Sequence, residues 1–367
     1  MGKTGTDPIC AGSPRVIRQS SGRKWGLSLF FVLLCLPLHA ADSLPINVYP
    51  CPRADAAPAL DGKLDDAAWQ KAPLVSGFRH FGKDVLVPVQ TSFRLLWDDK
   101  CLYLGVRCDE PEMAKLSPIK FAHDEHAVFG NETIEFFLDP NHTHDVYYQL
   151  AFNCAGSLYD GEREATFWNS DAQVKSFLGS DFWSVEVAVP WGPLSAKPAV
   201  GKVVGFNVCR DRNVGDKTWS NWAQVQGGFH DPDRFAHLVL SGTPELIGQL
   251  GPEFRKGGRS GPITVYSAEG FAQTSYANLS AAAFAEMAKL LASLDETRRQ
   301  EQDPAAAAEI GRRADEYKAK VADLQRQSQG NLDAATWTRL DLELQQIVGQ
   351  LSQMVWEARL TALLNGI

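Results

Sequence analysis

The sequence predicts a mainly β protein: an antiparallel β-sandwich of the jelly-roll or immunoglobulin-like kind, followed by a C-terminal α-helical hairpin or three-helix bundle. Two observations predict this order. Residues 46–240 contain short segments in which β-branched, aromatic and polar residues alternate, and turn-forming residues separate these segments. Beyond residue 276, apolar residues recur at steps of three and four, which is the period of an α-helix. No helical period interrupts the first region, so an α/β fold is not expected.

The strands of the sandwich are expected where alternation with a period of two, or a short β-rich run, lies between turn signals. Turns are indicated at Asp98–Lys100 and at Asp139–Asn141, where residues that favour turns cluster. Several short strands with turns between them are typical of a sandwich. The expected strands are residues 90–96, 102–108, 133–138, 146–153, 182–189, 203–210 and 235–240.

The C-terminal part is predicted to be a linker followed by helices. Residues 241–275 are rich in Gly and Pro, which predicts a linker with one short strand near 263–266. Residues 276–366 are predicted to form three antiparallel helices, one of which begins at Asp303-Pro304, a typical N-cap followed by proline. The last helix carries an apolar seam that is expected to close a bundle or to pair with another copy of the chain. Its members are Trp337, Leu340, Leu344, Ile347, Leu351, Met354 and Ala358.

The N-terminal segment has the layout of a secretory signal peptide. Basic residues up to Arg23 and Lys24 precede a short apolar run, and the run ends in small residues at Ala40 and Ala41. Residues 1–40 are therefore predicted to be removed, and the mature protein is expected to be secreted, periplasmic or extracellular. The run is short for a bilayer span, so no membrane attachment is expected after cleavage. An uncleaved anchor is the alternative.

Charge and cysteine content argue against several classes of protein. The net charge is −8 and the basic residues form no stripe, so a nucleic-acid binder is not expected. An odd number of irregularly spaced cysteines follows the signal, which does not predict a disulfide scaffold. One disulfide and buried free thiols are the alternatives. No Cys/His spacing indicates a zinc site or a covalent haem site. The cysteines are Cys51, Cys101, Cys108, Cys154 and Cys209.

An ordered set of motifs runs through the predicted sandwich. It includes an Ala-Leu-Asp-Gly opening with Trp69, Asn-Glu-Thr-Ile-Glu at 131–135, Asp-Pro at 139–140, and Asp-Pro-Asp-Arg-Phe at 231–235. In this order and spacing the motifs resemble the family 9 carbohydrate-binding modules among the DOMON-like sandwiches, over residues 46–240. The resemblance implies a β-sandwich that recognises sugars without catalysing a reaction and serves polysaccharide breakdown. Most of the motif residues, Trp69 among them, are expected to be architectural.

The resemblance also implies a binding site. Family 9 modules hold a sugar between two aromatic side chains, and the matching positions here are Phe129 and Phe229, where the best-known members carry Trp. A sugar ring buries its C–H faces on such rings, while carboxylates, amides and guanidinium groups bind its hydroxyls. The alternative for each Phe is a loop residue packed on the core.

Polar partners are expected on the neighbouring strands. Glu135 matches the strand carboxylate of the family, and alternation turns it away from the apolar face of its strand. Gln149 has the same facing. Ala151 stands where the resemblance implies Arg, so Arg210 or Arg107 is the candidate that would supply the cationic donor from a neighbouring strand.

Calcium is a second implication of the resemblance. Asp139, Asn141 and Asp145 form an oxygen-rich turn of the type that binds this ion. A solvated turn is the alternative reading. No other cofactor is expected.

Several other functions stay open at this point. An enzyme is not expected, because no Gly-x-Ser-x-Gly motif occurs and Glu132 and Glu135 are not expected to flank one bond. A haem-binding DOMON-like domain would need an axial ligand such as Met113, the only Met in the sandwich. The remaining alternatives are a structural or interaction protein that self-associates through its helices, and an accessory part of a glycoside hydrolase system.

Overall fold

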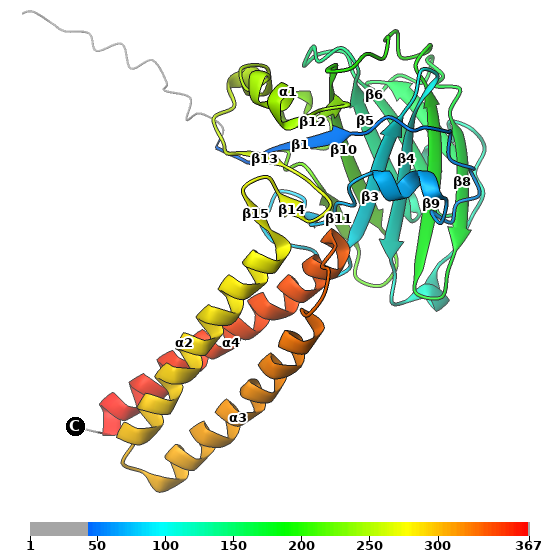
Figure 1. The fold of residues 1–367 in the computed structure, drawn as a ribbon. Helices are drawn as coiled ribbons and strands as arrows, with labels where there is room; N and C mark the ends of the chain where they lie inside the picture. Colours follow the sequence, from blue (N-terminus) through cyan, green and yellow to red (C-terminus); the bar gives the residue numbers. More distant parts are fainter. Residues whose placement is uncertain (1–42, 366–367) are drawn as a thin grey trace, which may run out of the picture. The chain divides into compact units, whose positions relative to one another are not determined.

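The computed structural model describes residues 43–365. The predicted signal peptide, residues 1–40, lies outside this range. In the described part, two β-sheets face each other as the predicted sandwich, and three long helices follow them in sequence (Figure 1). The predicted fold class is therefore confirmed.

Nine strands make up the larger sheet of the described chain and four make up the smaller one. The larger sheet runs in the order β13 (Ile263–Val265), β1 (Ile46–Cys51), β12 (Ala236–Leu240), β10 (Val203–Arg212), β5 (Thr133–Asp139), β6 (Tyr148–Asn153) and β7 (Leu158–Glu162), with β11 (Thr218–Asn221) and β2 (Arg79–His80) branching from β10. The smaller sheet runs in the order β3 (Thr91–Trp97), β4 (Cys101–Asp109), β9 (Phe182–Pro190) and β8 (Gln173–Leu178).

Short helical turns connect these strands. They are η1 (Ala67–Lys71), η2 (Met113–Lys115), η3 (His126–Gly130), η4 (Pro232–Arg234), α1 (Pro244–Gln249) and η5 (Glu253–Gly258). Trp69 of η1 is fully buried, as expected, and donates through its indole N–H to Glu186 on β9. The same carboxylate accepts from the backbone N–H groups of Asp61 and Gly62, so one buried acid fixes the loop before η1 against the smaller sheet.

The core lies between the two sheets and is built by alternation. Ile134, Phe136 and Leu138 of β5 point into it and are fully buried. The residues between them face the outer side of the larger sheet. The predicted facing of Glu135, away from the apolar side of its strand, is therefore confirmed.

The larger sheet differs from the prediction in one respect. β1 pairs in parallel with β12 on one side and with β13 on the other, so this edge of the sandwich is not antiparallel. The pairing joins Val48 to His237 and to Val265, residues that are far apart in the sequence. Periodicity describes one segment at a time and cannot specify such a pairing.

Residues 241–275, predicted to be a linker, contain more structure than expected. They hold α1, η5, strand β13 and a small hairpin of β14 (Gly270–Phe271) and β15 (Thr274–Ser275). Ile247 and Phe254 are buried against Ile46 and Val239. Several of the Gly and Pro residues of this stretch lie in its turns. Its apolar residues pack against the edge of the larger sheet, so the stretch is not a simple linker. Independent folding of the sandwich and the helices remains a prediction.

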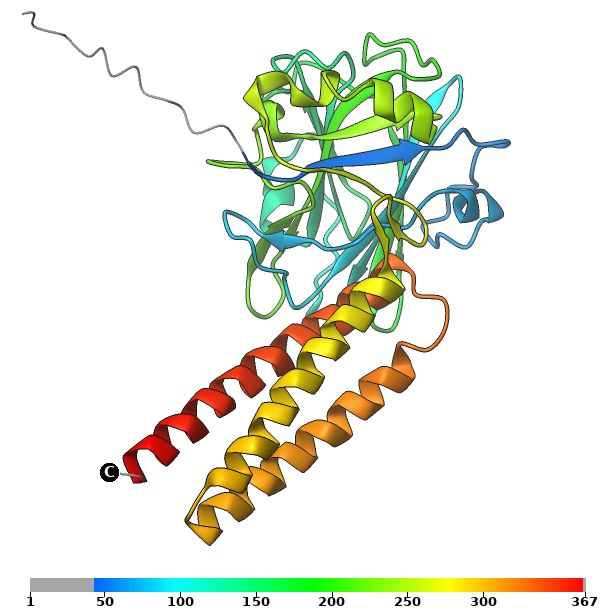
Figure 2. The same ribbon diagram turned by 60° about the vertical axis from the view of Figure 1, so that its left-hand side comes forward.

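The helical unit consists of α2 (Tyr276–Gln300), α3 (Pro304–Gln327) and α4 (Ala334–Asn365), which lie side by side (Figures 1 and 2). The Asp303 carboxylate accepts from the N–H of Ala305 and so caps α3, as predicted. The seam of α4 packs against α2 and α3, with Leu344 and Leu351 almost fully buried. Within residues 43–365, no helix combines the length and the apolar character that a membrane crossing needs.

All the cysteines in the described residues are free thiols, and four of the five are buried. Burial raises the pKa of the Cys51 and Cys209 thiols well above the usual value. Of the two alternatives left open by the sequence, the structure therefore has the free thiols.

A charge on the α4 seam should unfold the helical unit. Leu344 is 1% exposed and contributes to the core of the three helices. Burying an unpaired carboxylate there costs several kcal/mol, so Leu344→Asp should reduce the helical signal in circular dichroism and lower the melting temperature. Gln346→Asp is the matched control, because it places the same charge on an exposed position of α4. Equal helicity and melting temperature for the two variants would show that position 344 is exposed to water.

Candidate functional site

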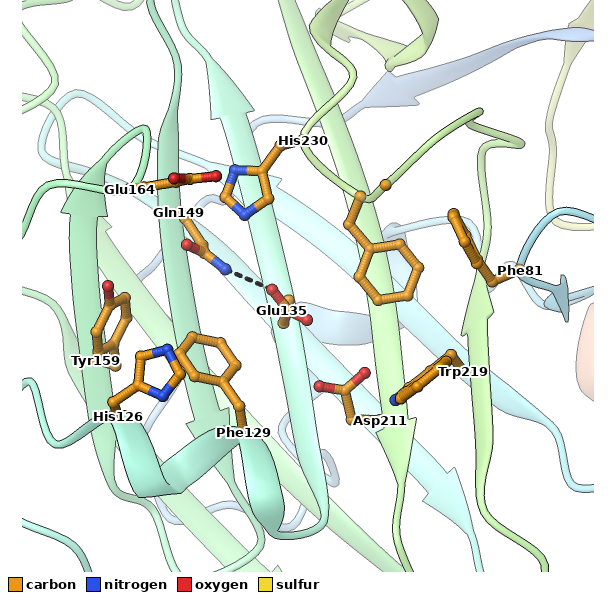
Figure 3. A pocket seen from close by; sticks show the side chains of 12 residues that line it. Phe81, His126, Phe129, Glu135, Gln149, Tyr159, Glu164, Asp211, Trp219 and His230 are labelled. Carbon is orange, nitrogen blue, oxygen red and sulfur yellow. Dashed lines mark hydrogen bonds between the residues drawn. The ribbon is translucent and has the colours of Figure 1, made fainter.

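A cavity of about 670 Å³ lies on the outer side of the larger sheet (Figure 3). Its floor comes from three neighbouring strands, β5, β6 and β10. Its walls come from η3, β7, β11 and the loops around residues 81, 164 and 228–230. The lining residues are Phe81, His126, Phe129, Glu135, Gln149, Tyr159, Glu164, Asp211, Trp219, Gly228, Phe229 and His230.

Strand register places the floor residues. β5 pairs with β10 so that Glu135 lies opposite Cys209, and with β6 so that Glu135 lies opposite Ala151 on the other side. Asp211 follows two residues after Cys209 and therefore shares its face. Gln149 shares the face of Ala151 for the same reason. The cavity floor thus follows from alternation in three strands that the sequence predicts.

Two groups of aromatic rings form the walls. Phe129 of η3 meets Tyr159 of β7 edge to face, with ring centroids 4.9 Å apart. Phe229 meets Phe81 in the same way at 5.3 Å. Trp219 of β11 is 63% exposed and lies beside Phe81 at the cavity (Figure 3). The structure therefore brings the two predicted stacking residues, Phe129 and Phe229, to one cavity, each supported by a second ring.

The floor carries a hydrogen-bonded row of polar groups. The side-chain amide of Gln149 donates to Glu135, and Asp211 of the next strand lies near enough for its charge to act on Glu135. Burial, followed by the negative charge of Asp211, raises the pKa of Glu135 well above its usual value. Burial also raises the pKa of Asp211, to about 7. Burial therefore favours the protonated form of both carboxyl groups, and the charge of Asp211 adds to this effect at Glu135.

The remaining polar groups of the cavity lie in its walls. Nδ1 of His230 and the hydroxyl of Tyr147 are hydrogen-bonded to each other at 2.9 Å. Burial lowers the pKa of the His230 imidazole. Glu164 is exposed at the rim. Among the described residues that line the cavity, none is Lys or Arg.

Arg210 does not reach the cavity, in contrast to the prediction. It shares the face of Phe206 and Val208, which belong to the core between the sheets, and it is 1% exposed. Its guanidinium binds Glu132 at 3.1 Å and Glu110 at 3.3 Å. Alternation along β10 explains this direction, because Arg210 stands between Cys209 and Asp211, which both face outward.

Each residue of the predicted calcium turn has a polar partner. Asp139 accepts from the backbone N–H of His144 at 2.7 Å. Asn141 accepts from Lys202 at 3.2 Å, and Asp145 forms an ion pair with Arg163. Cationic side chains therefore contact two of the three expected ligands, and the calcium site stays a prediction.

Another group of metal-ligand side chains converges within the described residues. Nε2 of His123 lies 3.3 Å from Asp160 and 3.7 Å from Asp124. Asp160 is buried, and its other oxygen accepts from Ser170. The imidazole contacts the two carboxyl groups directly in this arrangement.

Several lining residues were not predicted from the sequence. Alternation would have found Asp211, because it lies two residues beyond Cys209 on the outward face. Phe81 and Trp219 carry no such signal. They meet the cavity because β2 pairs with β11, with His80 opposite Ser220, and this pairing joins distant parts of the chain.

Enzymes that act on plant polysaccharides contain related segments. Endo-1,4-beta-xylanase A of Thermoanaerobacterium saccharolyticum is 26% identical over 194 residues, which cover 51% of this chain and 16% of the enzyme. Exoglucanase XynX of Acetivibrio thermocellus is 25% identical over 198 residues, which cover 52% of this chain and 17% of the enzyme. The chain therefore matches only about a sixth of the length of these relatives.

Solved structures resemble the sandwich as well. A family 9 carbohydrate binding module from Caldicellulosiruptor kristjanssonii, in complex with cellotriose, has a TM-score of 0.41 and 19% sequence identity, and the match covers 55% of this chain and 95% of that one. The same module in complex with glucose has a TM-score of 0.42, 20% identity and coverages of 55% and 97%.

The family match agrees with the resemblance that the sequence motifs indicate. Residues 60–243 match the family described as Carbohydrate family 9 binding domain-like, which is half of the chain. This match covers most of the sandwich, including the floor and both aromatic walls of the cavity. The chain belongs to the Carbohydrate family 9 binding domain-like family.

Proposed function

We propose that this protein binds carbohydrate in the cavity between Phe129 and Phe229 and has no catalytic activity of its own. The observation that carries the proposal is the arrangement of two aromatic walls around a floor of hydrogen-bonding groups. Aromatic rings cover the apolar C–H faces of a pyranose, and the floor groups bind its hydroxyls. The relatives and structures that resemble the chain favour the same ligand class, since they are polysaccharide-degrading enzymes and sugar-bound modules.

The floor geometry argues against glycoside hydrolysis at this site. Hydrolysis uses two carboxyl groups that flank the glycosidic bond at a separation of about 5 Å or more. Glu135 and Asp211 stand on the neighbouring strands β5 and β10 and line one floor, rather than facing each other across the cavity. Glu132, the other candidate considered from the sequence, is turned to the core and paired with Arg210. The match to the enzymes covers too little of their length to carry over their activity.

The protein is proposed to act outside the cytoplasm, in support of polysaccharide breakdown. The motivation is the signal-like segment in residues 1–40, together with the sugar-binding role. No cofactor is needed for this function.

Self-association through the helices is a second proposal. Trp356, Leu360 and Leu363 near the end of α4 are all exposed, which is unusual for large apolar side chains on one helix. A second copy of the chain would bury these side chains.

Export can be tested at the N-terminus of the mature protein. If residues 1–40 are a cleaved signal, material from the periplasm or medium should begin at Ala41 or Asp42. N-terminal sequencing or intact mass measurement reads this directly. Full-length protein confined to the cytoplasm would contradict the proposal.

Removing either stacking ring should weaken sugar binding. Phe129→Ala and Phe229→Ala each delete the apolar surface on which a sugar ring would lie, so each should cost about 1–2 kcal/mol, or roughly tenfold in affinity. Calorimetric or NMR titrations with glucose and cellotriose, using the full chain, measure the change. Phe167→Ala is the matched control, because Phe167 is 78% exposed and does not line the cavity. Unchanged affinity in both cavity variants would move the site elsewhere.

The carboxyl pair should make folding stability depend on pH. The pKa of Asp211 rises from 3.8 to about 7 on folding, so the folded protein holds the proton more tightly than the unfolded chain between these values. The contribution of the pair to the free energy of unfolding is therefore fully present below about pH 4 and is lost as the pH rises through about 7. Asp211→Asn should remove this dependence and raise the melting temperature, relative to the wild type, more at pH 8 than at pH 5.

Glu164→Gln is the control for this experiment, because it removes a negative charge from the exposed rim of the same cavity. Its melting curve should follow that of the wild type across the pH range. If Asp211→Asn also follows the wild type at every pH, folding does not raise the pKa of Asp211.

A further inference from the structure

The carboxyl groups that line the cavity have no cationic side chain beside them in the described lining. Three carboxyl groups line it, those of Glu135, Asp211 and Glu164, and none of the described lining residues is Lys or Arg. The nearest arginines along β10, Arg210 and Arg212, are turned to the other side of the sheet and bind Glu110 there. A cavity lined by one sign of charge attracts ligands of the opposite sign.

The floor pair lacks a cation that proteins ordinarily place beside buried carboxylates. The cross-strand neighbours of Glu135 on this face are Cys209 and Ala151, and neither donates a hydrogen bond to it. Among the described residues, the side chain that donates to Glu135 is that of Gln149, and it is neutral. Glu135 and Asp211 are each 5% exposed. Burying negative charge without a positive partner is costly, so a ligand that brings a positive charge would gain from both groups.

The walls favour a cation as well. Phe81, Phe129, Tyr159, Trp219 and Phe229 surround the floor. The face of an aromatic ring attracts an ammonium group by about 0.5–2 kcal/mol, more when water is excluded. The carboxyl groups lie between the two sets of rings (Figure 3), so a group bound to the floor would also lie near the rings.

We propose that the preferred ligands of this cavity are amino sugars, with the ammonium group bound to Glu135 and Asp211 and the pyranose ring held between the aromatic walls. This inference rests on the proposed sugar-binding function. An ammonium group has three donors and no acceptor, whereas a hydroxyl both donates and accepts. A bound ammonium favours the ionised form of the floor carboxyl groups, which then only accept, and hydrogen bonds between ions of opposite charge are about twice as strong as neutral ones. The floor therefore distinguishes an ammonium from a hydroxyl at the same position of the sugar.

The test compares three sugars that differ at one substituent: D-glucosamine, N-acetyl-D-glucosamine and D-glucose. Calorimetric or NMR titration of the full chain near pH 7 should show glucosamine binding at least about tenfold more tightly than either neutral sugar. Added salt should weaken the binding of glucosamine far more than that of glucose, because screening acts on the charged pair. Tetramethylammonium serves as a cation without a sugar ring and should bind more weakly than glucosamine.

Variants of the floor test the assignment of the ammonium. Asp211→Asn should bring the ratio of glucosamine to glucose affinity close to one, whereas Asp171→Asn, at an exposed position that does not line the cavity, should leave that ratio unchanged. A ratio that survives in Asp211→Asn would place the ammonium elsewhere and overturn the assignment. Melting temperatures of both variants verify that they are folded.

The outcomes separate this inference from the proposed function. Glucose binding that equals or exceeds glucosamine binding would overturn the preference for amino sugars and leave sugar binding intact. Tetramethylammonium binding as tight as that of glucosamine would show a cation site without sugar recognition and overturn the ligand class. Absence of binding by all three sugars would contradict the proposed function itself.

Discussion

The pairing of β5 with β10 decides what lies on each side of the larger sheet. Its register joins Ile134 to Arg210 and Glu135 to Cys209. The first pair points into the core, and the second points toward the cavity. Because side chains alternate strictly along a strand, a slip of one residue would exchange the two sets and place apolar residues in the cavity and carboxyl groups in the core. The core, the buried ion network and the candidate site all depend on this one register.

The buried ion network strengthens that register. Arg210 lies between Glu132 and Glu110, and Arg212 binds Glu110 through two nitrogens. Removing one member would leave a buried charge without a partner, which typically costs about 3–5 kcal/mol. The network joins the start of β5, the end of β4 and the end of β10, so it fixes the strands that carry Glu135 and Asp211. The cations of this part of the sheet are thereby used on the core side, which leaves the outer face acidic.

Local patterns were sufficient to predict most of the fold and the centre of the site. Alternation along β5 gave the facing of Glu135, and the aromatic positions 129 and 229 followed from the motifs. The same alternation, applied to Phe206, Val208 and Arg210, would have turned Arg210 inward. What local patterns do not contain is pairing between distant segments. The parallel edge made by β1, and the approach of Phe81 and Trp219 to the cavity, both depend on such pairings.

The floor and the walls of the cavity are built from different kinds of structure, and this division has a consequence for recognition. Glu135, Gln149 and Asp211 stand on paired strands, whose hydrogen bonds fix their positions. Phe129 and Phe229 stand on a short helical turn and a loop, where insertions and substitutions are tolerated more easily. Affinity from apolar contact can therefore change with the walls, while the sign of the charge that the ligand meets is set by the sheet. A change of ligand class would require a change on the strands, such as a cation at position 151 beside Glu135, rather than a change in the loops.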